Sequence, residues 1–507
     1  MSPSAVPRRG SVPLLALVLI LSFTTIAPGA AQGPGDKIDP ELRDSARAGS
    51  LDRFFVVLAE QADLSAAAAL SEKRLKARYV FETLRATAER TQAPLQGLLT
   101  DRGLEVSSYF VINQLLVEAP SGRSISLADL DELAARGDVA RLEPVRPAFL
   151  PDALPGYAAA PGSGDPEEAS RGIVRWNVHA IGADQLHDLG ITGAGLVVGV
   201  LDSGADHQHP GLTEKYRGSN GVHDYNWLDP SSDGSLTPVD SNGHGTHVTG
   251  TAVGSTDSSV FGVAIGAEWI HCRGLGPGAS AATILTCLQF FLAPTDLAGQ
   301  NPDPDLAPDV TNHSYICPFC GLQTAFANLE SAGIFAAAGA GNAGPTCGSV
   351  FDPATYANLI AIGGTDPTDR HAALGDYSSR GPNIDGSGIR PHLVAPGTDI
   401  QSSFPGGGFG LLTGTSMATP HVTGAVALIW QARPELRGQV VATREVLHRS
   451  AFPRLNVGND CPVPGPMPPP VPNNLYGNGF LDVVAALRLF GDGFETTDTT
   501  RWSATVP

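Results

Sequence analysis

Three residues far apart in the chain carry the side chains that catalysis by a hydroxyl nucleophile requires: Asp202, His244 and Ser416. A serine hydroxyl is a poor nucleophile until a neutral imidazole accepts its proton. The imidazole in turn needs a carboxylate that fixes its tautomer and stabilises its charged form. The order Asp, His, Ser along the chain occurs in one known arrangement of these groups. Only a folded sheet could bring residues with this spacing together.

The segments around Asp202 and His244 also allow simpler interpretations. Asp202 follows the apolar run 196–201, which predicts a buried strand, and active sites of open parallel sheets lie beyond such strand ends. Acidic residues nevertheless open many ordinary loops. His244 lies among small residues and is either a catalytic base or a hydrogen-bonded loop histidine. His244 and His247 are also spaced like two metal ligands on one helical face, although the glutamate of the H-E-x-x-H zinc signature is missing.

Ser416 is placed at the beginning of a predicted helix. The apolar residues 424–430 predict the helix behind it, and Pro420 is tolerated in a first helical turn. A serine in this position is most often an N-cap. The same position favours a developing oxyanion, because free backbone N–H groups point out of a helix N-terminus.

Three segments together resemble the signature segments of subtilases, the subtilisin-like serine peptidases. They are 202–204 (Asp-Ser-Gly), 244–248 (His-Gly-Thr-His-Val) and 414–421 (Gly-Thr-Ser-Met-Ala-Thr-Pro-His). The resemblance extends over residues 172–488. Within it, three further segments more closely resemble the bacillopeptidase-F-like branch: the segment around Cys272, 293–297 and 472–477.

The resemblance implies both a fold and a set of roles. The fold is α/β, with a doubly wound parallel sheet flanked by helices. Ser416 is implied to be the nucleophile, His244 the general base and then acid, and Asp202 the carboxylate that orients it. Subtilases also place an asparagine side chain in the oxyanion hole, and the segment 340–345 matches that position at Asn342. By itself an asparagine among glycines is most often a turn residue.

The substrate-pairing strand of subtilases corresponds here to 312–316 (Asn-His-Ser-Tyr-Ile). The resemblance therefore assigns substrate binding to Ser314, Tyr315 and Ile316. Ile316 replaces a glycine of the family pattern, and glycine permits close backbone approach. The branched side chain either narrows the primary specificity pocket or points away from it.

The N-terminal sequence has the pattern of an export signal. Arg8 and Arg9 precede an apolar stretch over 12–27, and the small residues 28–31 follow, which predicts a secretory signal peptide over 1–31. The apolar run is interrupted by polar residues and falls short of the ~20 residues of a membrane anchor. We therefore expect a secreted, extracellular protein that has no membrane association after signal removal.

A small module, 32–150, is expected between the signal and a processing linker. The sequence pattern predicts a small α+β unit. Its expected elements are strand 54–58, a helix through 77–88, one or two strands within 106–117, a helix that starts at the Ser126/Asp129 capping box and ends at Gly137, and strand 139–142. In order and size it resembles the subtilase propeptide, a ferredoxin-like inhibitor that assists folding. The Pro-rich linker 151–171 suits cleavage, the catalytic domain is 172–488, and an acidic tail is 489–507.

Composition limits the partners of the chain. It has 51 acidic and 32 basic side chains and a net charge of −19, which argues against binding to the phosphate backbone of nucleic acids. Six cysteines suffice for two or three disulfides in an exported protein. Cys317 and Cys320 could bridge each other, since a thioredoxin-like context for redox chemistry is lacking. The pairing of the other four cysteines stays open.

An acidic stretch precedes His244 in the sequence and could bind a metal ion. It contains Asp224, Asp229, Asp233 and Asp240. Subtilases often bind structural calcium, but this spacing matches no EF-hand loop, so a solvated acidic loop is favoured. We expect no cofactor for catalysis, and structural calcium is left open.

The sequence thus predicts a secreted serine endopeptidase that hydrolyses peptide bonds in protein or peptide substrates through a Ser416 acyl-enzyme. The resemblance implies an inactive precursor whose own prodomain is an intramolecular inhibitor. Two alternatives stay open. One is a catalytically silent binding protein whose pocket is closed around Ile316, and the other is a metallohydrolase that uses His244 and His247.

Overall fold

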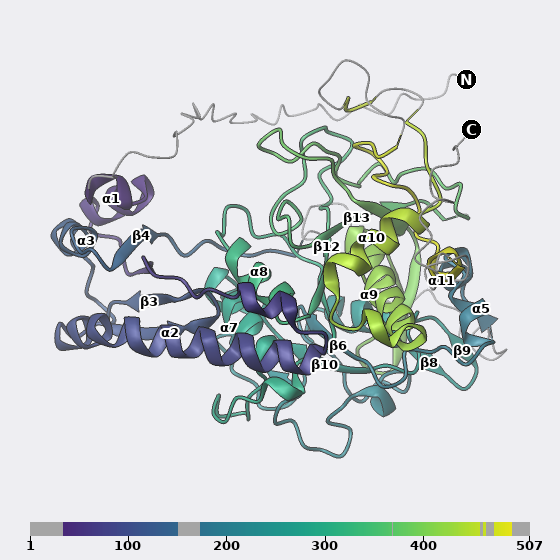
Figure 1. Ribbon diagram of the computed structural model, residues 1–507, viewed down its shortest axis with the longest axis horizontal. Helices are drawn as coiled ribbons and strands as arrows, with labels where there is room; N and C mark the ends of the chain where they lie inside the picture. Colours follow the sequence, from purple (N-terminus) through teal and green to yellow (C-terminus); the bar gives the residue numbers. More distant parts are fainter. Residues whose placement is uncertain (1–33, 151–172, 368, 457–459, 463–470, 489–507) are drawn as a thin grey trace, which may run out of the picture.

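The computed structural model describes residues 34–150, 173–367, 369–456, 460–462 and 471–488. The predicted signal peptide 1–31, the linker 151–171 and the tail 489–507 lie outside the described residues. Two main sheets organise the described chain, a four-stranded sheet before the linker and a seven-stranded sheet after it (Figure 1).

The larger sheet is wholly parallel, with the order β14-β13-β12-β11-β6-β10-β7. Its strands are β6 Val197–Leu201, β7 Trp227–Leu228, β10 Glu268–Cys272, β11 Val310–His313, β12 Phe335–Gly339, β13 Ile360–Thr365 and β14 Leu393–Pro396. After β6 the chain forms the edge strand β7 and then β10 on one side, and it crosses to β11 and builds outward through β12, β13 and β14 on the other, so the sheet is doubly wound. The crevice of such a sheet lies at the switch point, here between the carboxyl ends of β6 and β11. The predicted fold class is confirmed.

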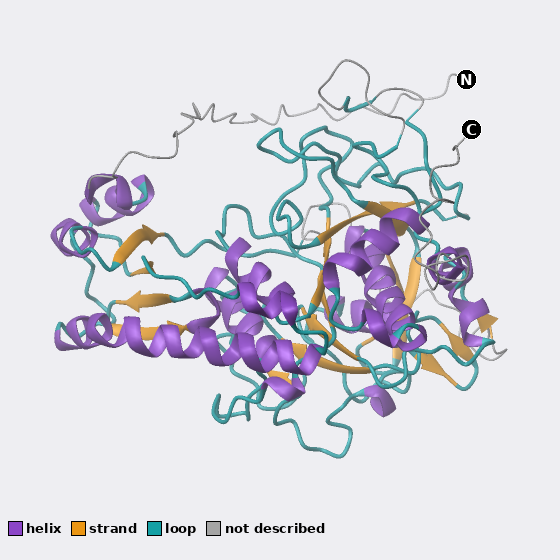
Figure 2. Ribbon diagram, viewed as in Figure 1, coloured by secondary structure: helices purple, strands orange, loops and turns teal. Residues whose placement is uncertain are grey.

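Helices cover both faces of this sheet (Figure 2). On one face α6 (His244–Val253) and α9 (Thr415–Ala432) share a core with Val198 and Val200, and on the other α7 (Ala281–Leu292) and α8 (Gln323–Ser331) pack with Leu201. This division follows from the alternation of side chains along a strand. The remaining elements of this part are α4 Trp176–Ala180, α5 Ala183–His187, α10 Val440–Ser450, α11 Val483–Arg488, the hairpin β15 Ile400–Phe404 and β16 Gly408–Leu412, and the short strands β5 Ile173–Val174, β8 Ser255–Thr256 and β9 Ser259–Val260. Within the described ranges, none of the helices combines the length and the apolar character that crossing a bilayer demands.

The smaller sheet is antiparallel, with the order β2-β3-β1-β4. Its elements are α1 Pro40–Arg47, β1 Arg53–Leu58, α2 Lys73–Asp101, β2 Glu105–Tyr109, β3 Gln114–Glu118, α3 Leu127–Ala134 and β4 Val139–Glu143. This is the predicted ferredoxin-like arrangement, and the run 106–117 forms two strands. The capping box of Ser126 and Asp129 is present, but the predicted end of its helix at Gly137 is wrong. The helix ends at Ala134, and its C-cap is Ala135 in a right-handed conformation that needs no glycine.

Helix α2 is much longer than the sheet it covers. Its 29 residues span ~44 Å, whereas a strand of five or six residues spans ~17–20 Å. Leu95 and Leu99 pack in the core of the small module itself. Val80 and Leu84, nearer the helix N-terminus, belong to the core that the module shares with α7 and α8. The N-terminal half of α2 therefore extends onto the large module (Figure 1).

The two modules also meet through the turn between β2 and β3. Tyr109 Oη donates to Ala282 O at 3.2 Å, and Phe110 N donates to Gln289 Oε1 at 2.8 Å, both on α7. From α8, Asn328 Nδ2 donates to Val111 O at 2.8 Å. These contacts seat one face of the small sheet on α7 and α8.

Three disulfides are formed within the described residues. Cys272 joins β10 to α7 at Cys287, Cys317 bonds Cys320 as predicted, and Cys347 bonds Cys461 across 114 residues. The first and third pairings could not be fixed from sequence, because they depend on which helix and loop the fold brings together.

Candidate active site

Asp202 and His244 form a buried pair at the carboxyl end of β6. The imidazole Nδ1 lies 2.7 Å from Asp202 Oδ1, Asp202 is fully buried, and His244 is 4% exposed. Burial raises the pKa of Asp202, and its interactions with His244 act in the opposite direction. Because a carboxylate oxygen can only accept, the bond places the proton of a neutral His244 on Nδ1 and leaves Nε2 as the basic nitrogen.

Ser203 connects this pair to the helix that carries the histidine. Its N–H donates to Asp202 Oδ1 at 2.7 Å, and its Oγ accepts from Gly245 N and donates to Asp240 Oδ1, each at 3.0 Å. A Cβ on Gly245 would lie 2.1 Å from Gly204 O, so only glycine allows this approach. The first turn of α6 is thereby held against the end of β6.

Ser416 is the second residue of α9. The N-cap is Gly414, so the alternative that Ser416 caps the helix is wrong, and Pro420 lies in the second turn, not in the first as predicted. Pro420 has no N–H for the Ser416 carbonyl four residues earlier. Ser314 Oγ donates to that carbonyl instead, at 3.0 Å, and Ser416 Oγ makes a long contact of 3.4 Å with Ser314 O.

Asn342 follows β12 and contacts the first turn of α9. Its Oδ1 accepts from Thr415 N at 2.9 Å and from Thr415 Oγ1 at 3.0 Å. These two donors fix the orientation of the carboxamide, so that Nδ2 lies on the side away from Thr415. Asn342 is therefore tied to the helix that carries Ser416, a role that a simple turn residue would not have.

The predicted residues thus fall into two contact groups at one edge of the sheet. Asp202 and His244 form the first, and Ser314, Ser416 and Asn342, linked through Thr415, form the second. Asp202 follows β6, and Ser314 follows the neighbouring strand β11. Adjacent strands lie ~4.8 Å apart, so the two groups share the crevice at the switch point.

Ile316 pairs with a segment of the same chain that precedes the linker. Phe149 N donates to Ile316 O at 2.9 Å, and Ile316 N donates to Phe149 O at 3.0 Å. On the other side of that segment, Ala148 N donates to Ala279 O at 3.2 Å, and Ala281 N donates to Arg146 O at 2.8 Å. Residues 146–149 therefore lie as an extended strand between two backbone edges.

The side chains of this edge differ in what they can reach. Tyr315 is fully buried in the core shared with α8, so only its backbone faces the paired segment. Ile316 is half-buried, and one of its methyl groups lies 3.9 Å from the position that a Cβ on Gly341 would take. The branched side chain points across toward the Asn342 loop rather than away from it.

His247 does not share a site with His244. Its Nε2 lies 2.8 Å from Ile400 O and 3.2 Å from Gly410 O, and burial lowers the pKa of His247 to about 3. The imidazole is a neutral donor to backbone carbonyls. The predicted alternative of a metal site at His244 and His247 is therefore contradicted, and among the residues placed by the structure no cluster of three or more His, Cys, Asp or Glu is arranged to hold a metal ion.

The acidic stretch before His244 is organised around an arginine. Arg273 Nη1 donates to Asp229 Oδ2 at 2.9 Å and to Asp233 Oδ2 at 3.0 Å, and its Nε donates to Ser203 O at 3.1 Å. Arg273 is 3% exposed and the Asp229 side chain is fully buried, so the expected solvated loop is wrong for this pair. Sequence reasoning missed Arg273, although a cation directly after a buried strand at the carboxyl edge is a usable signal.

An aspartate–histidine pair and a helix-borne serine at the same carboxyl edge of a parallel sheet are typical of α/β serine hydrolases. The sequence profile of the subtilase family matches residues 193–479, more than half of the chain. The chain belongs to the subtilase family, the subtilisin-like serine endopeptidases, which are hydrolases. The predicted resemblance is confirmed.

Individual relatives agree with this membership. Bacillopeptidase F of Bacillus subtilis (strain 168) is 32% identical over 486 residues, which cover 89% of this chain and 31% of the relative. Subtilisin Savinase of Lederbergia lenta is 34% identical over 62% of this chain and 99% of the relative. Alkaline protease of Alkalihalobacillus alcalophilus is 34% identical over 62% of this chain and 70% of the relative. The chain therefore spans under a third of bacillopeptidase F and nearly all of Savinase.

The buried arginine gives a test of the acidic loop. Arg273→Met leaves Asp229 buried without its cation, and removal of one partner from a buried pair costs about 3–5 kcal/mol. We expect the free energy of unfolding to fall by that amount in denaturant titrations, performed on a Ser416→Ala background to prevent self-digestion. Asp233 is 48% exposed, so Asp233→Asn is the matched control, with a much smaller loss, because solvent screens an exposed ion pair. Equal losses in the two variants would contradict the assignment.

Proposed function

We propose that the chain is a secreted serine endopeptidase in which Asp202, His244 and Ser416 form the catalytic triad. The observation that carries the proposal is the buried 2.7 Å bond between Asp202 and His244 at the strand end next to the one that contacts Ser416. Family membership supports the peptidase activity. The substrates are proteins or peptides.

In the proposed reaction, Ser416 Oγ attacks the carbonyl carbon of the scissile bond while its proton passes to His244 Nε2. The imidazolium, stabilised by Asp202, gives that proton to the leaving amine as the C–N bond breaks, and an ester to Ser416 remains. A water molecule then loses a proton to His244 and attacks the ester. The second product leaves as a carboxylic acid, and the Ser416 hydroxyl is restored.

Asn342 is proposed to donate to the oxyanion that forms in each step. Its carboxamide oxygen accepts from Thr415, so its Nδ2 is the group proposed to donate to the reacting carbonyl oxygen. The backbone N–H of Ser416, in the first turn of α9, supplies a second donor. Both groups are fixed before the charge develops, which is the condition for effective electrostatic stabilisation.

Ser314, Tyr315 and Ile316 are proposed to bind substrate mainly through their backbone. The extended pairing of residues 146–149 with Ile316 and with 279–281 supports this, because a substrate strand would use the same donors and acceptors. The Ile316 side chain, directed toward Gly341, narrows the space for the side chain at the cleaved bond. We therefore expect a preference for small side chains there.

The same pairing supports an inactive precursor. Residues 146–149 occupy the edges that a substrate strand would need, and the small module is seated on α7 and α8. In the proposal, residues 32–150 are the inhibitory prodomain, cleavage within 151–171 starts activation, and the signal peptide 1–31 directs secretion to the extracellular space. No cofactor is needed for catalysis in this family, and structural calcium stays an open part of the proposal.

Ser416→Ala tests the nucleophile. We expect wild-type protein with a processed linker to be labelled by a fluorophosphonate probe and to hydrolyse casein, and the variant to lose both, because the proposed reaction uses the Ser416 hydroxyl as its nucleophile. Labelling that persists in the variant would refute the nucleophile. Hydrolysis that a chelator abolishes while the probe has no effect would favour a metallohydrolase, and an inert wild type would favour a binding protein.

Asn342→Ala tests the oxyanion donor. Loss of one such donor typically lowers kcat by ~10²–10³, and because the bond forms mainly in the transition state, we expect KM to change little. Steady-state kinetics on a chromogenic peptide measure both constants. Asn358→Ala is the matched control, since this half-buried asparagine donates to Glu330 away from the crevice. An unchanged kcat in Asn342→Ala would rule out the role.

Ile316→Gly tests the narrowed pocket. Removing the branched side chain is expected to raise kcat/KM for large side chains at the cleaved bond, relative to alanine, by about tenfold or more. Profiling with a peptide library measures the ratio. Ile316→Val keeps the branch and should behave like the wild type. A preference that is the same in all three proteins would show that Ile316 does not line the pocket.

A further inference from the structure

The first turns of α2 contain a concentration of basic residues that the helix itself does not favour. Four of its first six residues are basic, namely Lys73, Arg74, Lys76 and Arg78, and the first turn has no acidic residue. The positive end of the helix dipole lies there, so each cation is locally unfavourable. A conflict between local preference and the observed sequence is expected where side chains serve a contact.

That contact is with the large module, at a place well separated from the crevice. Arg74 and Arg78 both pair with Asp305, and Arg78 Nε lies 2.5 Å from Asp305 Oδ1. Lys73 Nζ donates to Ala307 O at 2.6 Å. These residues of the large module directly precede β11 in the chain.

A second chain segment completes this surface. Lys76 Nζ donates to Gly438 O at 2.9 Å, and Gln439 Nε2 donates to Ser71 O at 2.8 Å. Both lysines are buried by the contact, and each donates to a backbone carbonyl of the large module. We name the surface formed by Asp305, Ala307, Gly438 and Gln439 the basal surface.

The basal surface lies at the amino edge of the same sheet whose carboxyl edge holds the candidate active site. Asp309 marks this edge: its Oδ2 accepts from Val197 N, the first residue of β6, at 2.9 Å, and its carboxylate pairs with Arg437. β6 ends at Leu201, directly before Asp202, and β11 runs from Val310 to His313, directly before Ser314. Five strand residues separate the two edges by ~16 Å.

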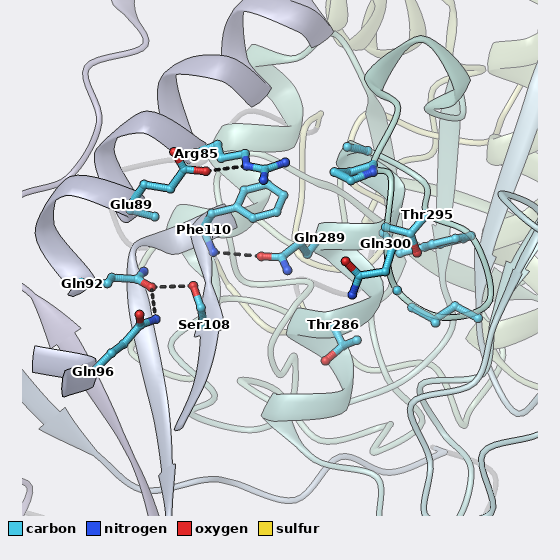
Figure 3. Close-up of a pocket in the computed structure, with 16 residues that line it drawn as sticks. Arg85, Glu89, Gln92, Gln96, Ser108, Phe110, Thr286, Gln289, Thr295 and Gln300 are labelled. Atoms are coloured by element: carbon cyan, nitrogen blue, oxygen red, sulfur yellow. Dashed lines mark hydrogen bonds and ion pairs between the residues drawn. The ribbon is translucent and has the colours of Figure 1, made fainter. Parts of the chain in front are cut away.

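A cavity of about 420 Å³ lies next to the seat of the small sheet, between α2 and the large module. Arg85, Glu89, Gln92 and Gln96 of α2 line one wall, and the opposite wall includes Thr286 and Gln300 of the large module (Figure 3). Phe110 and Gln289, whose hydrogen bond joins the two modules, line the same cavity (Figure 3). The contacts of α2 with the large module therefore begin at the basal surface, continue through Val80 and Leu84 in the shared core, and reach the seat of the small sheet.

We propose that the basal surface is a second docking site for the N-terminal turns of α2, one that keeps the small module bound after the linker is cut. This inference rests on the proposed function only in treating the small module as an inhibitor. Because the basal contact and the seat belong to one module, that module leaves the crevice only when both sets of contacts open, so the basal contact slows dissociation. The Arg74 and Arg78 side chains are 63% and 48% exposed, so release is faster at high ionic strength.

The experiment uses the full chain with Ser416→Ala and with a recognition sequence for an unrelated protease placed within 151–171. After cleavage by that protease, the dissociation rate of the N-terminal fragment is followed with a fluorophore on that fragment, at about 0.1 M and about 0.5 M NaCl. Catalysis by the chain itself is absent, so the result is independent of the triad. An inactive wild type would refute the proposed peptidase and leave this measurement standing.

We expect Asp305→Arg to speed dissociation about tenfold or more at low salt, because like charges then meet across the contact. Adding Arg74→Glu and Arg78→Glu should restore slow release, since the swapped charges attract again. Glu60→Arg is the matched control: Glu60 pairs with Arg90 inside the small module and should leave the rate unchanged.

If Asp305→Arg does not fold, Arg74→Glu with Arg78→Glu, and separately Lys76→Met, alter only the α2 side and should each speed release. Dissociation as slow as in Glu60→Arg for all of these variants would overturn the proposal. Failure of the charge swap to rescue Asp305→Arg would also overturn it, because a general loss of stability would not be reversed by the partner charges.

Discussion

The buried hydrogen bond between Asp202 and His244 is the interaction on which the rest of the site depends. A carboxylate with no exposed surface is unfavourable unless it accepts hydrogen bonds, and here the imidazole and Ser203 N–H both donate to Asp202 Oδ1. The bond can form only because Gly245 lets α6 approach the end of β6 closely. Arg273 secures the same strand end from the other side through Ser203 O. The position of one proton on one imidazole thus involves three segments of the chain.

Pro420 gives the nucleophile helix a comparable constraint. Because proline has no N–H, the Ser416 carbonyl lacks its usual hydrogen-bond donor within the helix. A buried carbonyl without a donor is unfavourable, so another donor is needed. Ser314 Oγ is that donor. Ser314, which is proposed to bind substrate, is therefore hydrogen-bonded directly to Ser416, the proposed nucleophile. Thr415, one position earlier, binds Asn342 in the same way from the neighbouring strand end.

Much of this could be predicted from sequence, and the omissions have a common cause. Local patterns were sufficient for the strand 196–201, for the capping box at Ser126 and for the three signature segments. The partners of Arg273 and of four cysteines were not predictable, because such pairs are distant in sequence and neither residue carries a local sign of the other. The predicted helix end at Gly137 was wrong because this helix ends at a C-cap residue in right-handed geometry, which does not require glycine. Pro420 was predicted in the first turn of the helix but lies in the second. A proline is tolerated there because Ser314 Oγ donates to the Ser416 carbonyl that lacks an N–H partner within the helix.

The length of helix α2 also depends on contacts that are distant in sequence. Its apolar spacing predicts a helix, but a helix that covered only the short sheet would not need 29 residues. The extra turns carry cations where the dipole opposes them, so their stability must come from the large module. Since β6 and β11 run from that contact to the crevice, the chain holds its small module at both edges of one sheet. A module attached only at the crevice would compete with substrate on equal terms, whereas attachment at the amino edge adds binding that no short substrate can provide.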